Sequence, residues 1–375
     1  MSAKRVLFIF GTRPEAIKLA PLIQVMKADI NFEIHVCISG QHRDMLDPLM
    51  SFFQITPDSD LDMMKENQTL FDITSNGLKS VEKIFDSFQP HLVITQGDTS
   101  TAFVGALAAF YKKVPVAHIE AGLRTGNNDS PFPEEMNRKL LSQLSAFHFS
   151  PTKLAKTNLL KEGIQGDIEI VGNTVIDALF MGLNLIESNP DKYHQKLEEK
   201  GIDFGKKIIL VTSHRRESFG PPLEEILSAI QEMANTFPDI QIVFPMHPNP
   251  NVQIAFQPLK QTRHPAILPV APLNYPDFIW LMKHSHLILT DSGGIQEEAP
   301  ALNKPVLVLR KETERIEGIE AGTAQLVGQD KQKIVSTVDA LLSDPKKYQE
   351  MANAENPFGD GTASQKIFKT LKEKL

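Results

Sequence analysis

Three carboxylic acids stand where strands of a predicted parallel sheet end. Asp98 follows the apolar strand LVIT, Glu120 ends the strand VPVAHIE, and Glu134 begins a helix after a loop with two prolines. Because ligands bind at the carboxyl ends of the strands in an open sheet, we expect these side chains to share one rim. Acids gathered without metal-binding cysteines or a His-x-His pattern favour proton transfer at a carbon or hydroxyl over metal-dependent hydrolysis. For Asp98 the alternative is a helix N-cap.

Two other segments place cations at helix or strand ends. In GTRPEAIKLAPL, Arg13 and Lys18 lie in a helix whose amino end predicts an anion site. In TSHRRESFG, His214 and Arg215 follow the predicted strand 208–213 and suit a phosphate or a sugar hydroxyl. The respective alternatives are a plain capped helix and a surface loop with paired arginines. The other histidines lack metal-ligand spacing, so we expect no metal site.

A pair of glycines predicts a further anion site. In LILTDSGGIQEEAP, Gly293 and Gly294 lie between an apolar strand and a helix, where backbone amides approach an anion closely. Glu297 or Glu298, one turn later, can accept hydrogen bonds from a ribose diol. Arg315 follows the next strand and adds a cation at the same rim.

Composition limits the class of protein. The 375 residues, 41% hydrophobic and 23% charged, suffice for two domains, and the net charge of -7 argues against nucleic acid as the partner. The single cysteine, Cys37, lies in the predicted strand EIHVCIS, so we expect a core residue and a reducing compartment. We find no signal-peptide pattern and no apolar run of about eighteen residues. These features predict a cytoplasmic protein that does not cross a membrane.

Both halves of the chain alternate short apolar strands with helices, which is typical of buried parallel sheets. The predicted strands are 6–10, 33–39, 92–95, 114–120, 146–150 and IEIV in the first half, and 208–213, 241–246, 266–270, 286–292, 305–310 and 324–328 in the second. The pattern predicts an α/β protein with two Rossmann-like doubly wound domains facing across a cleft. We place the domain boundary near Gly172.

Nine segments together resemble the non-hydrolysing UDP-N-acetylglucosamine 2-epimerases. They are GTRPEAIKLAPL, SGQHRDML, QGDTST, HIEAGLRTG, PFPEEMNR, GNTVIDAL, HRRESFG, TDSGGIQEEAP and ETERIEGIEAGT, and they span nearly the whole chain in order. The resemblance implies the GT-B type of fold, with an N-terminal domain 1–171 that the C-terminal helix 362–375 rejoins, and a UDP-binding domain 172–361. It also implies a homodimer that uses no metal or nicotinamide cofactor.

The resemblance further implies the reaction and the roles of residues. The family interconverts UDP-GlcNAc and UDP-ManNAc for cell-envelope polysaccharide, by elimination of UDP to a 2-acetamidoglucal and re-addition. By motif, the implied catalytic residues are Asp98, Glu120, Glu134 and His214. The implied substrate-binding residues are Arg13, Lys18, Arg215, Phe278, Ser292, Gly293, Gly294, Glu298 and Arg315.

The chain departs from the family pattern where some members bind a second UDP-GlcNAc as an activator. Asp44 and Asn67 stand at positions where those members have donors, which argues against strong activation. Four alternatives for the function stay open: a hydrolysing epimerase that releases free ManNAc, an epimerase of a related UDP-diacetamido sugar, a GT-B glycosyltransferase and a non-catalytic nucleotide-sugar sensor. The segment GTRPEAIKLAPL favours the non-hydrolysing group, and the three acids argue against a sensor.

Overall fold

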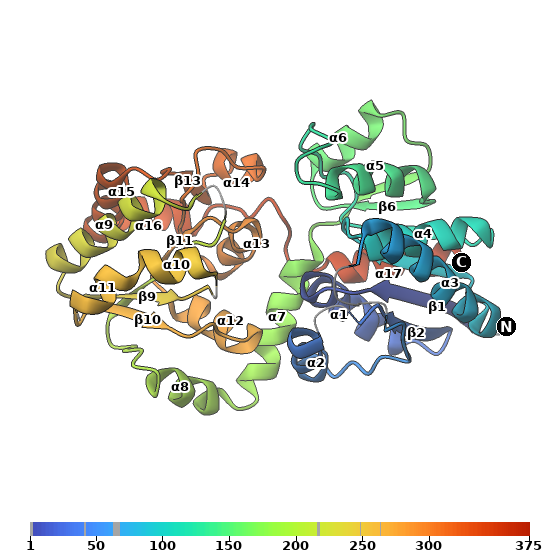
Figure 1. Cartoon of the computed structure of the whole chain (residues 1–375), viewed down its shortest axis with the longest axis horizontal. Coiled ribbons are helices and arrows are strands. Elements are labelled where there is room, and N and C mark those ends of the chain that lie inside the picture. The colour runs from blue at the N-terminus through green and yellow to red at the C-terminus, as the bar shows by residue number, and fades with distance from the viewer. Residues whose placement is uncertain (1–2, 41–42, 63–67, 216–217, 248, 263) are drawn as a thin grey trace. The chain divides into compact units, whose positions relative to one another are not determined.

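The computed structural model describes residues 3–40, 43–62, 68–215, 218–247, 249–262 and 264–375. Asn67 and the side chain of Asp44 lie outside this description. The chain divides into two compact units, which we call unit 1 (Met1–Met181 with Phe358–Leu375) and unit 2 (Gly182–Pro357). In Figure 1, helices surround the strands of each unit.

Unit 1 is built on one parallel sheet. Its strands are β1 (Lys4–Phe10), β2 (Phe32–Ile38), β3 (Ser59–Asp60), β4 (Leu92–Gln96), β5 (Val116–Ile119), β6 (Phe147–Ser150) and β7 (Asp167–Ile170). Its helices are α1 (Arg13–Lys27), α2 (Arg43–Phe52), α3 (Leu70–Phe88), α4 (Ser100–Tyr111), α5 (Glu134–Leu144), α6 (Lys153–Lys161), the start of α7 (Thr174–Glu187) and α17 (Ala363–Lys374). The strand order is β3-β2-β1-β4-β5-β6-β7.

Unit 2 repeats this architecture. Its strands are β8 (Lys207–Thr212), β9 (Ile240–Pro245), β10 (Ile267–Val270), β11 (Leu287–Thr290), β12 (Val306–Val308) and β13 (Ala324–Leu326), in the order β10-β9-β8-β11-β12-β13. Its helices are α8 (Pro190–Glu198), α9 (Pro221–Thr236), α10 (Pro250–Ala255), α11 (Gln257–Thr262), α12 (Tyr275–His284), α13 (Gly293–Glu298), the 3-10 helix η2 (Ala299–Leu302), α14 (Ile316–Glu320), α15 (Lys331–Ser343) and α16 (Pro345–Ala352).

These two sheets confirm the predicted α/β fold class with two doubly wound parallel sheets. Every predicted strand is present within two residues of its expected bounds, and β3 is the addition. In each sheet the order reverses beside the first strand, between β1 and β4 in unit 1 and between β8 and β11 in unit 2. A ligand site is expected at such a reversal, outside the carboxyl ends of the strands.

Each sheet has an apolar core of its own. In unit 1, Leu7, Ile9 and Val93 pack with residues of α3 and α4, and Cys37 belongs to the same cluster. Burial raises the pKa of the Cys37 thiol to about 12, so this cysteine is an inert core residue, as its strand pattern predicts. In unit 2, residues of β8, β9 and β11 pack against α9 and α15.

The last helix, α17, returns to unit 1 and packs against α1 (Figure 1). Its first turn is held by the buried Asp177 of α7, whose carboxylate accepts hydrogen bonds from the N–H groups of Ala363 and Ser364 at 3.2 and 2.7 Å. Nearby, a Cβ on Gly172 would lie 3.2 Å from the Cα of Gly359. Both ends of unit 2 therefore leave unit 1 at one place, and the division between the units falls within α7, beyond Gly172.

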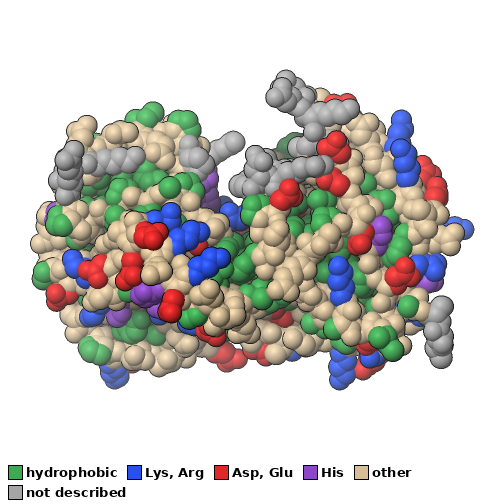
Figure 2. Space-filling view, turned by 90° about the horizontal axis from the view of Figure 1, so that it is seen from below, with side chains coloured by type: hydrophobic (Ala, Val, Ile, Leu, Met, Phe, Trp, Pro, Cys, Tyr) green, Lys and Arg blue, Asp and Glu red, His purple; other side chains and the backbone are tan. Residues whose placement is uncertain are grey.

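The surface carries charges of both signs. On the face shown in Figure 2, acidic and basic side chains are interspersed. This mixture accords with the modest net charge of -7. Among the described residues, no helix is long and apolar enough to cross a membrane.

Candidate active site

A buried carboxylate, Glu15, lies in unit 1 where the strand order reverses between β1 and β4. Thr12 and Glu15 form a capping box at the start of α1. Glu15 accepts hydrogen bonds from the N–H groups of Gly11 and Thr12, at 3.0 and 2.7 Å, and from the hydroxyl of Thr99 at 2.6 Å. The capping acid thus satisfies amides that precede the first turn of α1, and the anion site expected at this end of the helix stays a prediction.

Glu120 lies directly after β5 and is 7% exposed. Its backbone has a φ of 66°, a left-handed conformation that is costly for a residue with a side chain and that clusters at functional sites. The carboxylate accepts short hydrogen bonds from Lys18 and Gln96 and a longer one, 3.4 Å, from the amide of Asn173. Lys18, which the sequence assigned to the substrate, is therefore an ion-pair partner of Glu120 in this structure.

Asp98 lies after β4 and pairs with Arg138 of α5. Its Oδ2 accepts from Nε and Nη2 of Arg138 at 2.8 and 2.7 Å, and its backbone carbonyl accepts from the Asn137 amide at 2.9 Å. Burial raises the pKa of Asp98; Arg138 opposes this and Glu120 adds to it. Thr99, and not Asp98, caps α4. The carboxylate of Asp98 is therefore available for chemistry beside a guanidinium.

Glu134 and Glu135 begin α5 and differ sharply in their contacts. Glu135 is fully buried and accepts hydrogen bonds from the N–H groups of Thr125 and Gly126 and from Arg138. One oxygen of Glu134, Oε2, is buried without a hydrogen-bond partner among the described residues. A buried polar atom without a partner is rare in native proteins, so this oxygen is a candidate for contact with a ligand.

A buried histidine supports the loop that carries Asp98. Nε2 of His118, on β5, lies 2.7 Å from the carbonyl oxygen of Gly97, which has a φ of 71°. Burial lowers the pKa of His118 to about 4, so the ring is neutral at pH 7 and donates from Nε2. His118 therefore fixes the turn between β4 and Asp98.

We expect His118 to make folding dependent on pH. Its folded pKa of about 4 is below the ordinary 6.5, so the unfolded chain binds the extra proton. Stability is therefore full above pH 6.5 and is lost as the pH falls toward 4, by an amount on the order of 3 kcal/mol. Urea unfolding of the wild type and of His118→Gln, at pH 7 and 4.5, tests this. Equal pH dependence of the two proteins would contradict it.

In unit 2, His214 lies at the carboxyl end of β8 beside the buried Asp291, which follows β11. Nδ1 of His214 is 3.2 Å from Oδ1 of Asp291, and the ring stacks on His247 with centroids 5.4 Å apart. Burial alone would raise the pKa of Asp291, but the hydrogen bond and charge of His214 and the N–H groups around it lower the pKa below its usual value. The carboxylate therefore stays charged beside the imidazole.

The glycine loop of unit 2 is shaped by its neighbours. A Cβ on Gly293 would lie 3.2 Å from the guanidinium carbon of Arg315, so the glycine makes room for that cation. Nε of Arg315 donates to the buried Glu297 at 2.7 Å. Glu298 is 8% exposed and accepts from the hydroxyl of Tyr275 at 3.4 Å. The backbone of Ser292–Gly294, a guanidinium and a carboxylate thus meet at the carboxyl end of β11.

The structure gathers most of the candidate residues at these two rims. Asp98, Glu120, Glu134 and Lys18 lie on the rim of unit 1, while His214, Arg215, Ser292, Gly293, Gly294, Glu298 and Arg315 lie on the rim of unit 2. Arg13 begins α1, and Phe278 is half-buried on α12. Neither side chain makes a hydrogen bond or an ion pair within the part of the chain that the structure describes. Sequence reasoning missed Glu135, Arg138 and Asp291. Asp291 had a detectable signal, since it follows a buried strand as Asp98 and Glu120 do.

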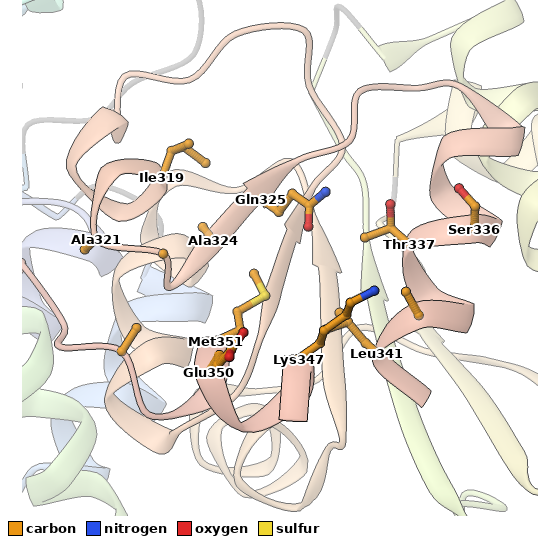
Figure 3. A pocket seen from close by; sticks show the side chains of 13 residues that line it. Ile319, Ala321, Ala324, Gln325, Ser336, Thr337, Leu341, Lys347, Glu350 and Met351 are labelled. Atoms are coloured by element: carbon orange, nitrogen blue, oxygen red, sulfur yellow. The ribbon is translucent and has the colours of Figure 1, made fainter. Parts of the chain in front are cut away.

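A separate surface cavity of about 640 Å³ lies in unit 2, between β13, α14, α15 and α16. Figure 3 shows Lys347 and Glu350 on its wall, and small or apolar side chains such as Ala324 and Met351 around them. It flanks the amino end of β13, where Ala321 and Gly322 enter the strand. It is therefore apart from the carboxyl ends of the strands.

Among the described residues, no group of three potential metal ligands occurs.

Comparison with known proteins gives one consistent result. The family model described as UDP-N-acetylglucosamine 2-epimerase matches residues 24–372. The UDP-N-acetylglucosamine 2-epimerase of Escherichia coli K12 is 50% identical over 371 residues, which is 98% of each chain. The enzyme of that name from Yersinia pestis is 47% identical over 370 residues, again 98% of each chain. The crystal structure of the Neisseria meningitidis UDP-GlcNAc 2-epimerase bound to UDP-GlcNAc has a TM-score of 0.89 and 47% identity, covering 98% of this chain and all of that one.

Proposed function

Since the chain belongs to the UDP-N-acetylglucosamine 2-epimerase family, we propose that it interconverts UDP-GlcNAc and UDP-ManNAc without releasing the free sugar. The observation that carries the proposal is the carboxyl edge of the unit 1 sheet, where Asp98 follows β4 and Glu120 follows β5 near enough for their charges to interact. Glu134 begins α5, the helix whose Arg138 pairs with Asp98. Epimerisation at a carbon needs carboxyl groups that accept and return a proton.

The C2 proton of UDP-GlcNAc is not next to a carbonyl group, so enolisation cannot acidify it. We propose an elimination instead. A carboxylate takes the C2 proton while the C1–O bond to UDP breaks with its electron pair, which leaves a C1=C2 double bond in 2-acetamidoglucal. UDP then adds back at C1, and a carboxyl group returns a proton to the opposite face of C2. The raised pKa of Asp98 suits a group that holds a proton between these steps.

The rim of unit 2 suits the UDP part of the substrate. His214, Arg215 and Arg315 supply positive or hydrogen-bonding groups for the diphosphate, whose charge grows as it leaves C1. The amides at Ser292–Gly294 can approach a phosphate closely because two glycines follow one another there. The Glu298 carboxylate is the acceptor that we assign to the ribose hydroxyls.

Replacement of Glu298 tests the nucleotide site. We expect Glu298→Ala to weaken UDP binding about ten- to hundredfold, because one charge-assisted hydrogen bond contributes roughly 1.5 to 3 kcal/mol. Titration calorimetry with UDP gives the affinity. Glu320→Ala, which changes an exposed glutamate of α14, is the matched control and should bind as the wild type does. Unchanged affinity in a folded Glu298→Ala protein would place the ribose elsewhere.

The reaction itself is tested in D2O. UDP-GlcNAc incubated with the enzyme should gain deuterium at C2 in both epimers, because the abstracted proton exchanges with solvent before it is returned. NMR of the sugar ring measures the isotope, and chromatography detects UDP with 2-acetamidoglucal. Epimerisation without deuterium at C2 and without the glycal would reject the elimination.

Product analysis distinguishes the alternatives. Free ManNAc as the main product would indicate a hydrolysing epimerase, and transfer of labelled GlcNAc to an acceptor would indicate a glycosyltransferase. Turnover of a UDP-diacetamido sugar in preference to UDP-GlcNAc would change the substrate but retain the mechanism. Binding of UDP-GlcNAc without turnover would indicate a sensor.

We also propose that the protein is a cytoplasmic homodimer that supplies ManNAc-type sugars for cell-envelope polysaccharide. Unit 1 exposes large apolar side chains in the first turn of α3 and the last turn of α4, with Phe71 86%, Phe110 59% and Tyr111 64% exposed. A second copy that covers either end of these helices would remove apolar area from water. Sedimentation equilibrium measures the mass, and a monomer at micromolar concentration would contradict the dimer.

A further inference from the structure

The carboxylate of Asp291 is fully buried and organises the loop that follows β8. Its Oδ2 accepts from the backbone N–H groups of His214 and Arg215, at 2.8 and 3.0 Å. The hydroxyls of Ser213 and Ser218 donate to the same oxygen, at 3.0 and 3.2 Å. Residues 213–215, directly after β8, and Ser218 are therefore held by a carboxylate that follows the neighbouring strand β11. Removal of that charge would disturb both the backbone and the ring of His214.

The other oxygen of Asp291, Oδ1, faces the ring of His214 and bears on which ring nitrogen carries the hydrogen. It is buried, accepts no hydrogen bond of regular geometry from the described residues, and lies at the ion-pair distance of 3.2 Å from Nδ1 of His214. A carboxylate can only accept, so a hydrogen bond between these two groups requires the hydrogen on Nδ1. The opposite nitrogen, Nε2, is left for a ligand, and the side chain is 41% exposed. In the charged ring both nitrogens donate, so Asp291 and an anion can be bound at once.

We propose that Asp291 is a positioning residue, which holds His214 with Nδ1–H toward itself and presents Nε2 to the diphosphate that leaves C1. This inference rests on the proposed function. His247, whose ring stacks on His214 with an interplanar angle of 19°, limits rotation of the imidazole from the side of β9. Because the same carboxylate binds the backbone of His214 and Arg215, ring and loop are oriented together.

The wild-type protein gives the first test. Nitrogen NMR of histidine-labelled protein reports which ring nitrogen carries hydrogen, and the signal missing from His214→Gln identifies His214. We expect hydrogen on Nδ1 in the neutral ring as well as in the charged one. Hydrogen on Nε2 alone in the neutral ring would overturn the proposal, whatever the activity of the enzyme.

Asp291→Asn gives the second test. The amide oxygen can still accept from the N–H groups of the loop, but the amide nitrogen now donates toward Nδ1 of His214. The neutral ring must then carry its hydrogen on Nε2, and the charged ring loses its acceptor. We expect kcat to fall about a hundredfold and UDP affinity about tenfold. Ser218→Ala, which removes another donor from the same carboxylate, is the matched control and should keep hydrogen on Nδ1.

A double-mutant cycle separates a role in orientation from a role in folding. If Asp291 acts through His214, Asp291→Asn should lower kcat by less than about threefold in a protein that already carries His214→Gln. An equal loss in both backgrounds would show that Asp291 acts on the fold instead. Should the wild type not epimerise UDP-GlcNAc, the proposed function fails, while the NMR signal and UDP affinity of these variants still decide whether Asp291 orients His214.

Discussion

Asp98→Asn is expected to slow epimerisation about a hundred- to ten-thousandfold, because removal of a general acid or base from a reaction at carbon has effects of that size. The substitution keeps the shape of the side chain and removes its ability to carry a proton. Asp98 lies at the end of β4, beside Glu120, and burial raises its pKa. Glu120→Gln and Glu134→Gln should be impaired similarly if the three acids share the proton transfers.

The measurement is the rate of conversion of UDP-GlcNAc, followed together with UDP affinity and melting temperature. UDP affinity should persist, since the groups that we assign to the leaving diphosphate and to the ribose belong to unit 2. Asp86→Asn is the matched control in the same unit, because Asp86 also forms an ion pair, with Lys112, but its side chain is 65% exposed. That control should retain wild-type activity. Full activity of Asp98→Asn in a folded protein would leave Asp98 as a structural partner of Arg138.

The positions of the acids were predictable because each strand of a parallel sheet can be recognised from a short stretch of sequence. Short apolar strands between helices predict parallel sheets, and the carboxyl ends of such strands form the ligand-binding rim. Asp98 and Glu120 each follow a buried strand, and the structure places them at that rim. The same rule would have found Asp291 after β11.

The partners of the acids were not predictable from the sequence alone. Lys18 and Glu120 are 102 residues apart, and Asp98 and Arg138 are 40 apart. The positive charge of Lys18 predicts an anionic partner. Only the order of the strands in the sheet decides whether that partner is a carboxylate of the protein or a phosphate of the substrate. The amino end of α1 shows the same limit. The spacing between Thr12 and Glu15 predicts that Glu15 caps the helix. Only the fold shows that Glu15 also accepts a hydrogen bond from the hydroxyl of Thr99.

The contact between Lys18 and Glu120 predicts a large change in stability. Their side chains are 16% and 4% exposed, so Lys18→Met removes a cation that contacts a buried carboxylate. We expect a loss of about 3 to 5 kcal/mol in the free energy of unfolding at pH 7. Lys112→Met is the matched control, because Lys112 pairs with Asp86 at the surface and should contribute only about 0 to 1 kcal/mol. Urea unfolding of both variants gives the two values.

The double variant Lys18→Met with Glu120→Gln separates stability from catalysis. A neutral amide in place of the carboxylate removes the charge that Lys18 balanced, so the free energy of unfolding should recover by more than half of what Lys18→Met loses. Epimerisation should stay near zero, because the group at the end of β5 can no longer carry a proton. If Lys18→Met costs no more than Lys112→Met, Glu120 is not held as a buried anion by Lys18. A double variant that regained activity along with stability would show that Glu120 is needed for folding and not for proton transfer.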